Sequence, residues 1–131
     1  MSALRISYLT MFTTDLEALP DFYVEVFALE EVVSSRSDRY RELKVGDLML
    51  GFPWIDAYAN LNMTDQADPT GVRSMVTFAA QGMSEVDTLV AKATEHGARL
   101  VKPAFQTDFG QYLAVVLDPE GNAVRIAAPA V

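Results

Sequence analysis

The sequence predicts an α+β fold that is built from two successive βαβββ modules. The first observation is a pattern of one strand, one helix and three strands, which occurs twice along the 131 residues. The second is a polar stretch at residues 60–70, which separates modules at about 4–59 and 71–131. The third is length, because each module alone would bury too little apolar surface to be stable. We therefore expect a single domain that contains both modules.

The first module begins with a short β-branched and aromatic run at residues 6–12, which predicts a strand. Thr14 and Glu17 have the spacing of a capping box, which predicts the start of a helix. One face of this helix would carry the apolar residues Leu16, Leu19, Phe22, Tyr23, Val26 and Phe27. Pro20 removes a hydrogen bond, so we expect a loose or kinked first turn. Three strands are predicted near residues 30–34, 39–45 and 48–52, with a hairpin turn at Gly46-Asp47.

The second module repeats this order of elements. Residues 73–80 alternate as a strand does, and Ser84 to Asp87 is predicted to cap a helix. The buried stripe of that helix would be Val86, Leu89, Val90 and Ala93. Gly97 is predicted to end the helix, because glycine readily takes a left-handed backbone conformation. Strands are predicted near residues 99–102, 111–117 and 123–127, with a turn at 118–122 between the last two.

Composition excludes several classes of function. Half of the residues are hydrophobic, which excludes disorder, and no run approaches the ~18 apolar residues of a membrane span. A net charge of −8 argues against binding to nucleic-acid phosphates or to an anionic membrane surface. The absence of cysteine excludes disulfides, iron–sulfur clusters and thiolate nucleophiles. The N-terminal residues show no apolar run followed by a cleavage signal, so we expect a cytoplasmic protein.

The single histidine, His96, is the one side chain whose ordinary pKa lies near neutrality. It falls in the last turn of the second predicted helix, away from the face that would line a pocket. A histidine at this position typically stabilises the helix C-terminus through the helix dipole. We therefore expect a structural role for His96. One histidine also excludes any site that needs two from the same chain.

Three segments resemble one protein superfamily. They are Asp15-Leu16-Glu17 with Phe22-Tyr23, Gly97-Ala98 with residues 100–103, and the hairpin 114–122 with its Asp-Pro-x-Gly-Asn turn. Together with the paired modules, they resemble the vicinal oxygen chelate superfamily, which includes glyoxalase I, extradiol dioxygenases, and fosfomycin- and bleomycin-resistance proteins. The resemblance covers nearly the whole chain. It implies one curved mixed sheet with the helices on its outer face.

Metal-dependent members of that superfamily usually bind the ion through His and Glu on strands one, four, five and eight. The matching positions in this chain are Tyr8, Leu50, Met75 and Arg125, with Ser74 replacing Met75 if strand five slips by one residue. These side chains cannot form a nitrogen and oxygen site for zinc, nickel, manganese or iron. We therefore expect no metal centre and no other cofactor.

Strand alternation predicts which side chains line the concave face, because the opposite face must pack against the helices. The predicted ligand-binding residues are Tyr8, Thr10, Phe12, Tyr40, Glu42, Leu50, Phe52, Trp54, Met75, Thr77, Phe109, Tyr112 and Arg125. Such an aromatic set is typical of a small-molecule pocket, although the same residues could simply fill the sheet or a subunit interface. Arg125 either pairs with a carboxylate such as Glu42 or awaits an anionic or carbonyl-bearing ligand.

The leading hypothesis is a metal-free small-molecule-binding protein that resembles the bleomycin-resistance branch and sequesters an aromatic or cationic, antibiotic-like compound. The resemblance implies a homodimer with pockets at the subunit interface, and we expect no nucleic-acid or membrane partner. The rival hypothesis is a lyase, isomerase or dioxygenase-type enzyme that uses Tyr8, Glu42 or Arg125 for acid–base or oxyanion chemistry. A third alternative is a subunit whose pocket is filled by its own side chains. The leading hypothesis assigns no catalytic residue.

Overall fold

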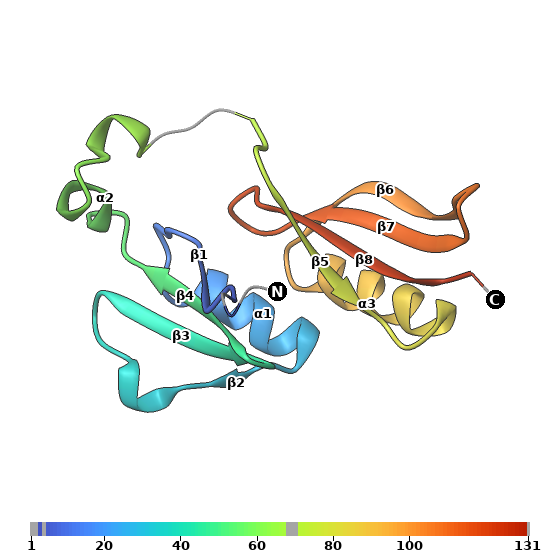
Figure 1. Cartoon of the computed structure of the whole chain (residues 1–131), viewed down its shortest axis with the longest axis horizontal. Helices are drawn as coiled ribbons and strands as arrows, with labels where there is room; N and C mark the ends of the chain where they lie inside the picture. Colours follow the sequence, from blue (N-terminus) through green and yellow to red (C-terminus); the bar gives the residue numbers. More distant parts are fainter. Residues whose placement is uncertain (1–2, 4, 68–70, 131) are drawn as a thin grey trace. The chain divides into compact units, whose positions relative to one another are not determined.

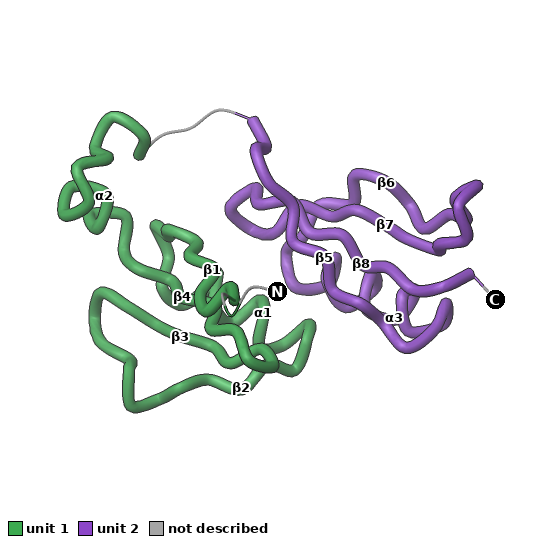
Figure 2. Tube along the Cα trace, viewed as in Figure 1, with its two compact units in different colours: residues 1–70 green, residues 71–131 purple. Residues whose placement is uncertain are grey.

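The computed structural model describes residue 3 and residues 5–67 and 71–130. The chain divides into two compact units, Met1–Thr70 and Gly71–Val131, which Figure 2 colours separately. Each unit contains a four-stranded mixed sheet of its own, so the chain has the mixed α+β fold that the sequence predicts. The strands expected in one sheet thus form two, because those of each module pair with one another. The arrangement of both modules as one domain stays a prediction.

The first unit has the predicted order of one strand, one helix and three strands (Figure 1). These elements are β1 (Tyr8–Thr10), α1 (Ala18–Phe27), β2 (Glu30–Glu31), β3 (Tyr40–Val45) and β4 (Leu48–Pro53). Three short helical segments, which the sequence did not predict, are η1 (Val33–Ser35), α2 (Ala57–Asn60) and η2 (Thr64–Gln66). The sheet order is β1-β4-β3-β2, with β1 parallel to β4 and the other pairs antiparallel.

Helix α1 begins at Ala18, later than the capping-box pattern predicts. The Asp15 carboxylate accepts hydrogen bonds from the backbone amides of Glu17 (3.0 Å) and Ala18 (2.9 Å), so it serves amides that have no partner within the helix. Because of this later start, Pro20 lies in the first turn, where a missing N–H costs no helical hydrogen bond. The predicted disruption at Pro20 is therefore wrong. Ala28 ends the helix in a left-handed conformation (φ 55°).

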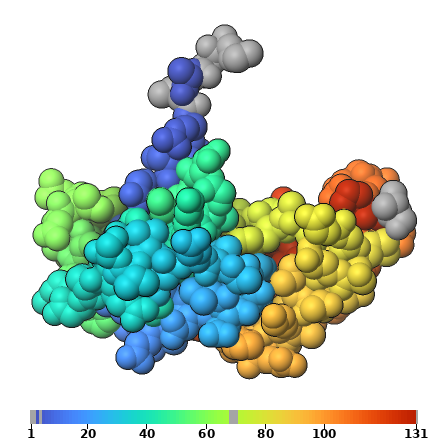
Figure 3. Space-filling view, turned by 90° about the horizontal axis from the view of Figure 1, so that it is seen from below, coloured from blue at the N-terminus to red at the C-terminus, as the bar shows by residue number. Residues whose placement is uncertain are grey.

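The predicted apolar face of α1 is buried against the sheet. Leu19, Phe22, Tyr23 and Val26 are almost inaccessible to solvent. The ring of Tyr23 lies 5.7 Å from the ring of Phe52 on β4, measured between centroids. In the space-filling view of Figure 3, α1 (light blue) adjoins the segment of β2 and β3 (cyan) without a gap. One face of this sheet is thus packed against α1, and this packing forms the core of the unit.

The second unit repeats the arrangement (Figure 1). Its elements are β5 (Met75–Ala79), α3 (Met83–Glu95), β6 (Arg99–Gln106), β7 (Gln111–Leu117) and β8 (Ala123–Pro129). The sheet order is β5-β8-β7-β6, with β5 parallel to β8. Strand β6 is longer than predicted and has irregular register at Lys102, which is typical of a β-bulge. The carboxylate of Asp118 holds the β7–β8 turn by accepting the amides of Glu120 and Asn122, both at 2.9 Å.

Helix α3 covers one face of the second sheet, where Val86 and Ala93 are fully buried. Gly97, with φ 100°, follows the end of the helix as predicted. The Nδ1 atom of His96 lies 2.8 Å from the carbonyl oxygen of Lys92, in agreement with the structural role expected at this helix terminus. None of the helices in the described parts of the chain is long and apolar enough to cross a membrane.

Candidate functional site

Within its own unit, each sheet packs one face against a helix, α1 or α3, and turns the other face away from that helix. Residues directly opposite one another on paired strands project to the same side, so the register assigns every side chain to a face. We call the side of the first sheet that faces away from α1 the first open face. Its residues are Tyr8, Thr10, Glu30, Tyr40, Glu42, Lys44, Met49, Gly51 and Pro53. Tyr8, Thr10, Tyr40 and Glu42 thus lie on the face that strand alternation predicts, and their contact with a ligand stays a prediction.

The predicted orientation of strand four is wrong. Leu50 pairs with Leu9 and Leu43, and Phe52 pairs with Arg41, so both side chains project toward α1. Leu50 is only 2% exposed and Phe52 is fully buried. Residues 48–52 are apolar at both alternating sets of positions, so no polar side chain indicated which set faces away from the helix. Met49 and Gly51 occupy the first open face instead of Leu50 and Phe52.

Tyr40 and Glu42 form a hydrogen-bonded pair on the first open face. The hydroxyl of Tyr40 donates to Oε1 of Glu42 at 2.6 Å, and Glu42 is 7% exposed. Burial raises the pKa of Tyr40 well above its usual value, and the hydrogen bond and negative charge of Glu42 raise it further. Tyr8, on the neighbouring β1 edge, contributes a smaller increase of the Tyr40 pKa. The tyrosine therefore keeps its proton at neutral pH and holds the carboxylate in place.

Gly51 provides the space in which the Tyr40 side chain lies. A Cβ atom at position 51 would approach the Tyr40 hydroxyl oxygen to 2.7 Å and its ring carbons to 3.4 Å. Glu42 is directly opposite Gly51 in the β3–β4 register. The missing side chain on β4 thus allows the phenol to lie across the sheet and reach the carboxylate.

Two further aromatic residues lie at the end of this sheet. Phe12 stacks on Tyr58 of α2, with ring centroids 3.9 Å apart and an interplanar angle of 21°. Trp54 pairs with the buried Thr13 in an isolated parallel bridge directly after β4. This register places Trp54 on the side of Phe52 rather than on the first open face. The sequence assigns Phe12 and Trp54 to ligand binding, and their contact with a ligand stays a prediction.

The second open face is the side of the second sheet that faces away from α3. It carries Met75, Thr77, Lys102, Phe105, Leu113, Val115, Ala123 and Arg125. Met75 pairs with Ala123 and Thr77 with Arg125, which agrees with the predicted register of strand five and not with a slip to Ser74. The Nε–H of Arg125 donates to the Thr77 hydroxyl at 3.0 Å. A pairing of Arg125 with Glu42, which lies in the other unit, stays a prediction.

Tyr112 does not lie on the second open face. It pairs with Ala128, and its hydroxyl donates to Oδ1 of Asp87 on α3 at 2.6 Å, so it projects toward the helix. The hydrogen bond to this carboxylate raises the pKa of Tyr112. This orientation takes Tyr112 away from the predicted pocket. The sequence could not decide the orientation, because β7 is apolar at both alternating sets of positions. Phe109 lies in the turn between β6 and β7 and is 71% exposed.

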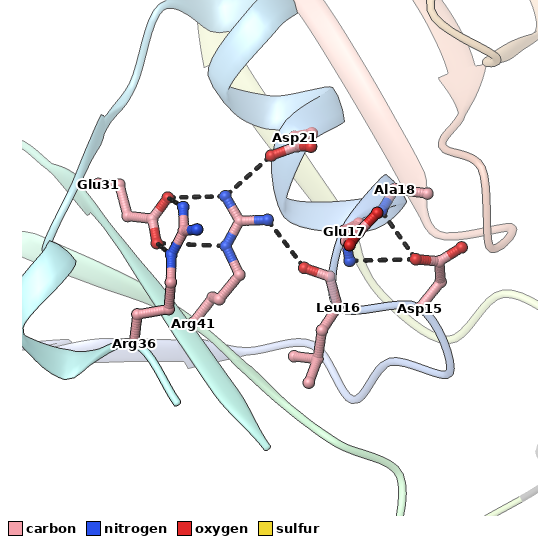
Figure 4. Close-up of polar contacts among 8 residues, drawn as sticks. All are labelled: Asp15, Leu16, Glu17, Ala18, Asp21, Glu31, Arg36 and Arg41. Atoms are coloured by element: carbon pink, nitrogen blue, oxygen red, sulfur yellow. Dashed lines mark hydrogen bonds and ion pairs between the residues drawn. The ribbon is translucent and has the colours of Figure 1, made fainter. Parts of the chain in front are cut away.

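A buried ionic cluster on the α1 side of the first sheet was missed by sequence reasoning (Figure 4). Arg41 is 6% exposed and donates to the Leu16 carbonyl oxygen (2.8 Å), to Asp21 (2.8 Å) and to Glu31 (2.6 Å). Glu31 also accepts two hydrogen bonds from Arg36, at 2.6 and 2.7 Å. Hydrogen bonds from Arg36 and Arg41 lower the pKa of Glu31 to about 2. Because the cluster joins α1, β2 and β3, we assign it to stability rather than to ligand binding.

The ligand positions of a superfamily metal site can be compared with the observed faces. With the corrected register, the residues facing outward from β4 are Met49 and Gly51 rather than Leu50, and neither offers a nitrogen or oxygen ligand. Across the described ranges, no group of three or more His, Asp or Glu side chains is arranged to hold a metal ion. The absence of a metal and of another cofactor stays a prediction.

Comparison with known families identifies the fold. The model of the Glyoxalase/Bleomycin resistance protein/Dioxygenase superfamily matches residues 5–126. The chain belongs to this superfamily. The match spans both units, so it accounts for the repeated order of elements that the sequence shows.

Solved structures of superfamily members have the same fold. A glyoxalase/bleomycin resistance protein/dioxygenase family enzyme from Burkholderia phytofirmans PsJN is 35% identical, with a TM-score of 0.90 over 94% of this chain and 97% of that one. A glyoxalase-related enzyme from Fulvimarina pelagi is 24% identical, with a TM-score of 0.81 over 97% and 89%. A lactoylglutathione lyase from Agrobacterium tumefaciens is 22% identical, with a TM-score of 0.71 over 95% and 92%. The comparison with curated proteins gave no significant match.

Proposed function

We propose that this superfamily member binds and sequesters an aromatic, cationic small molecule on its first open face. The observation that carries this proposal is the Tyr40–Glu42 pair, a buried carboxylate held by a phenol on the sheet face opposite α1. We further propose a metal-free, cytoplasmic homodimer with an antibiotic-like ligand. Membership of a superfamily that includes bleomycin resistance proteins supports the general class of function.

The chemistry of the face favours a planar cation. The Tyr40 hydroxyl donates its hydrogen bond to Oε1 of Glu42. The second carboxylate oxygen therefore remains for an N–H donor or a positive charge on the ligand. Tyr8 extends from the same face and is 53% exposed, so its ring offers a flat surface for stacking and for cation–π contact. The phenol that fixes the carboxylate lowers the entropic cost of binding, because the acceptor is already positioned.

Isothermal titration calorimetry with proflavine, a planar aromatic cation, tests the proposal. Glu42→Gln should weaken binding about tenfold, since it removes the charge and keeps the shape. Lys44→Met should strengthen binding about twofold, because Lys44 places a like charge on the same face. Glu25→Gln is the matched control, since Glu25 is an exposed carboxylate on α1, which packs on the opposite face of the sheet. Equal proflavine affinity in wild type and Glu42→Gln, or no binding at millimolar concentrations, would overturn the proposal.

The enzyme hypothesis has one specific observation in its favour. The Burkholderia phytofirmans structure, which is 35% identical, is described as a family enzyme. A reaction at the open faces would use Tyr8, Glu42 or Arg125. Tyr40 cannot act as a base at neutral pH, because its raised pKa keeps the hydroxyl protonated. Metal analysis of protein purified without chelator separates the alternatives, because stoichiometric zinc, nickel, iron or manganese would favour the enzyme.

A further inference from the structure

Arg125 is fixed in position on the second open face. Its Nε–H donates to Thr77 at 3.0 Å, and Thr77 lies directly opposite on the neighbouring strand β5. Within the described part of the chain, its two terminal nitrogens make no hydrogen bond or ion pair with protein, and the residue is exposed. A guanidinium held through Nε keeps its outer nitrogens available for an anion.

A second cation lies in the same row across the sheet. Arg125 pairs with Val115 on β7, and Val115 pairs with Lys102 on β6. Arg125 and Lys102 are therefore two strands apart, or about 10 Å between backbones, with an apolar side chain between them. The ammonium of Lys102 lies 4.7 Å from the centroid of the Phe105 ring, which belongs to the same face. The row thus has one positive charge at each end, Arg125 and Lys102, with the apolar side chain of Val115 between them.

The charges of the two units differ, and the difference favours an anionic ligand at this row. The first unit has five basic and twelve acidic residues, whereas the second has five and six. The four strands of the second sheet contain Arg99, Lys102 and Arg125 but no Asp or Glu. In a chain of net charge −8, an acid-free sheet with cations on the face turned away from α3 should attract an anion more than the acidic first unit does.

We propose that the second open face binds a small organic carboxylate with an apolar body. The carboxylate accepts hydrogen bonds from the terminal nitrogens of Arg125, the geometry that guanidinium and carboxylate groups favour. The apolar body lies across Val115 toward Lys102 and Phe105. Thr77 acts as a positioning residue, because it holds the guanidinium and leaves the ligand to Arg125. This site belongs to the second unit, and it selects the opposite sign of charge from the one proposed for the first open face.

Titration with sodium 2-naphthoate, followed by ¹H–¹⁵N NMR of the full chain, tests the site. We expect saturable shifts at the amides of Thr77, Val115 and Arg125 with a Kd near the millimolar range, as befits one exposed ion pair on an apolar surface. Arg125→Gln should weaken binding about tenfold, and Lys102→Gln about twofold with a smaller salt dependence.

Further variants separate binding from a general structural effect. Thr77→Val should weaken naphthoate binding about threefold, and Thr77→Ser, which keeps the hydroxyl, should restore it. Arg125→Lys keeps the charge but loses the paired donors, so it should also lose affinity and tests the same contact if Arg125→Gln fails to fold. Lys92→Gln is the control, since Lys92 is an exposed cation on α3.

Three results would overturn this proposal: shifts confined to other surfaces, unchanged affinity in Arg125→Gln, or no saturable shift at about 20 mM ligand, well beyond the expected Kd. Proflavine gives a separate readout for the first open face. Proflavine binding by Arg125→Gln should equal that of wild type, because that ligand is assigned to Tyr8 and Glu42 in the other unit. A loss of both ligands in Arg125→Gln would indicate misfolding, which the NMR spectrum of the unliganded variant reveals directly.

Discussion

Replacing Glu31 with glutamine removes the carboxylate that joins Arg36 and Arg41 in the ionic cluster of Figure 4. The side chain of Glu31 is 10% exposed and that of Arg41 is 7% exposed, so solvent screens this pair only weakly. Glutamine keeps the shape and one acceptor oxygen but carries no charge. The Arg41 guanidinium would then keep only Asp21 as a charged partner, and this carboxylate is 56% exposed.

The size of the effect follows from the pKa of Glu31. A fall from 4.5 to about 2 corresponds to roughly 3.5 kcal/mol at about 1.4 kcal/mol per pH unit. Arg36 is half exposed, which reduces its share, so we expect Glu31→Gln to cost about 2 kcal/mol at pH 7. Because the folded-state pKa is lowered, the stabilisation is complete above pH 4.5 and is lost as the pH falls toward 2. Roughly 40% of it remains at pH 3 on these two pKa values.

Urea unfolding of wild type and Glu31→Gln between pH 3 and pH 7 measures this contribution. The difference in unfolding free energy should be largest at pH 7 and should shrink steadily below pH 4.5. Glu30→Gln controls for the loss of a negative charge on the same strand, since Glu30 is exposed. A difference below about 0.5 kcal/mol at pH 7, the range of an ordinary surface substitution, or one independent of pH would refute the reasoning.

Two further substitutions test the register of the first sheet. Gly51→Ala should cost about 1–2 kcal/mol in thermal or urea unfolding, because its Cβ would displace the Tyr40 hydroxyl. Most of that cost should vanish in a Tyr40→Phe background, and equal costs in both backgrounds would show that Tyr40 is not the obstacle. Phe52→Ala should cost about 3–5 kcal/mol, the range for a fully buried aromatic residue, when measured by urea unfolding. A loss below 1 kcal/mol would instead place Phe52 on an exposed face, as strand alternation first predicted.

The order of elements and the buried face of α1 were predictable because their signals are local. The 3.6-residue spacing of Leu19, Phe22, Tyr23 and Val26 identifies one helical face, and tertiary packing buries that face in the structure. The first residue of α1 was harder to predict, because Thr14 and Asp15 are both residue types that cap a helix N-terminus. Pro20 limits the choice, since proline is tolerated in a helix only within the first turn. Only hydrogen-bond geometry distinguishes the two starts.

The faces of the strands were predictable only where polar and apolar residues alternate. In β3, Tyr40 and Glu42 alternate with Leu43 and Val45 on the opposite side, so the phase is fixed by composition. The same alternation assigns Arg41 to the helix side, where the structure forms the ionic cluster.

In β4 and β7 both faces are apolar, so composition leaves the phase open. Partner strands resolve it, because Leu50 pairs with Leu43 and Tyr112 pairs with Ala128. On β6 the bulge beside Lys102 breaks the regular alternation. The face of Lys102 therefore could not be assigned from spacing alone.

The close approach of Tyr40 to Gly51 couples two positions that are eleven residues apart in sequence. A side chain at position 51 fits only if the residue at position 40 is small, so the combined volume of the two is constrained rather than either residue alone. Among relatives, a large residue at 51 should therefore accompany a small one at 40. Such an exchange would move the bulk from β3 to β4 and remove the phenol from the buried carboxylate. The ligand preference of this face can thus diverge through two compensating substitutions while the packing of α1 stays intact.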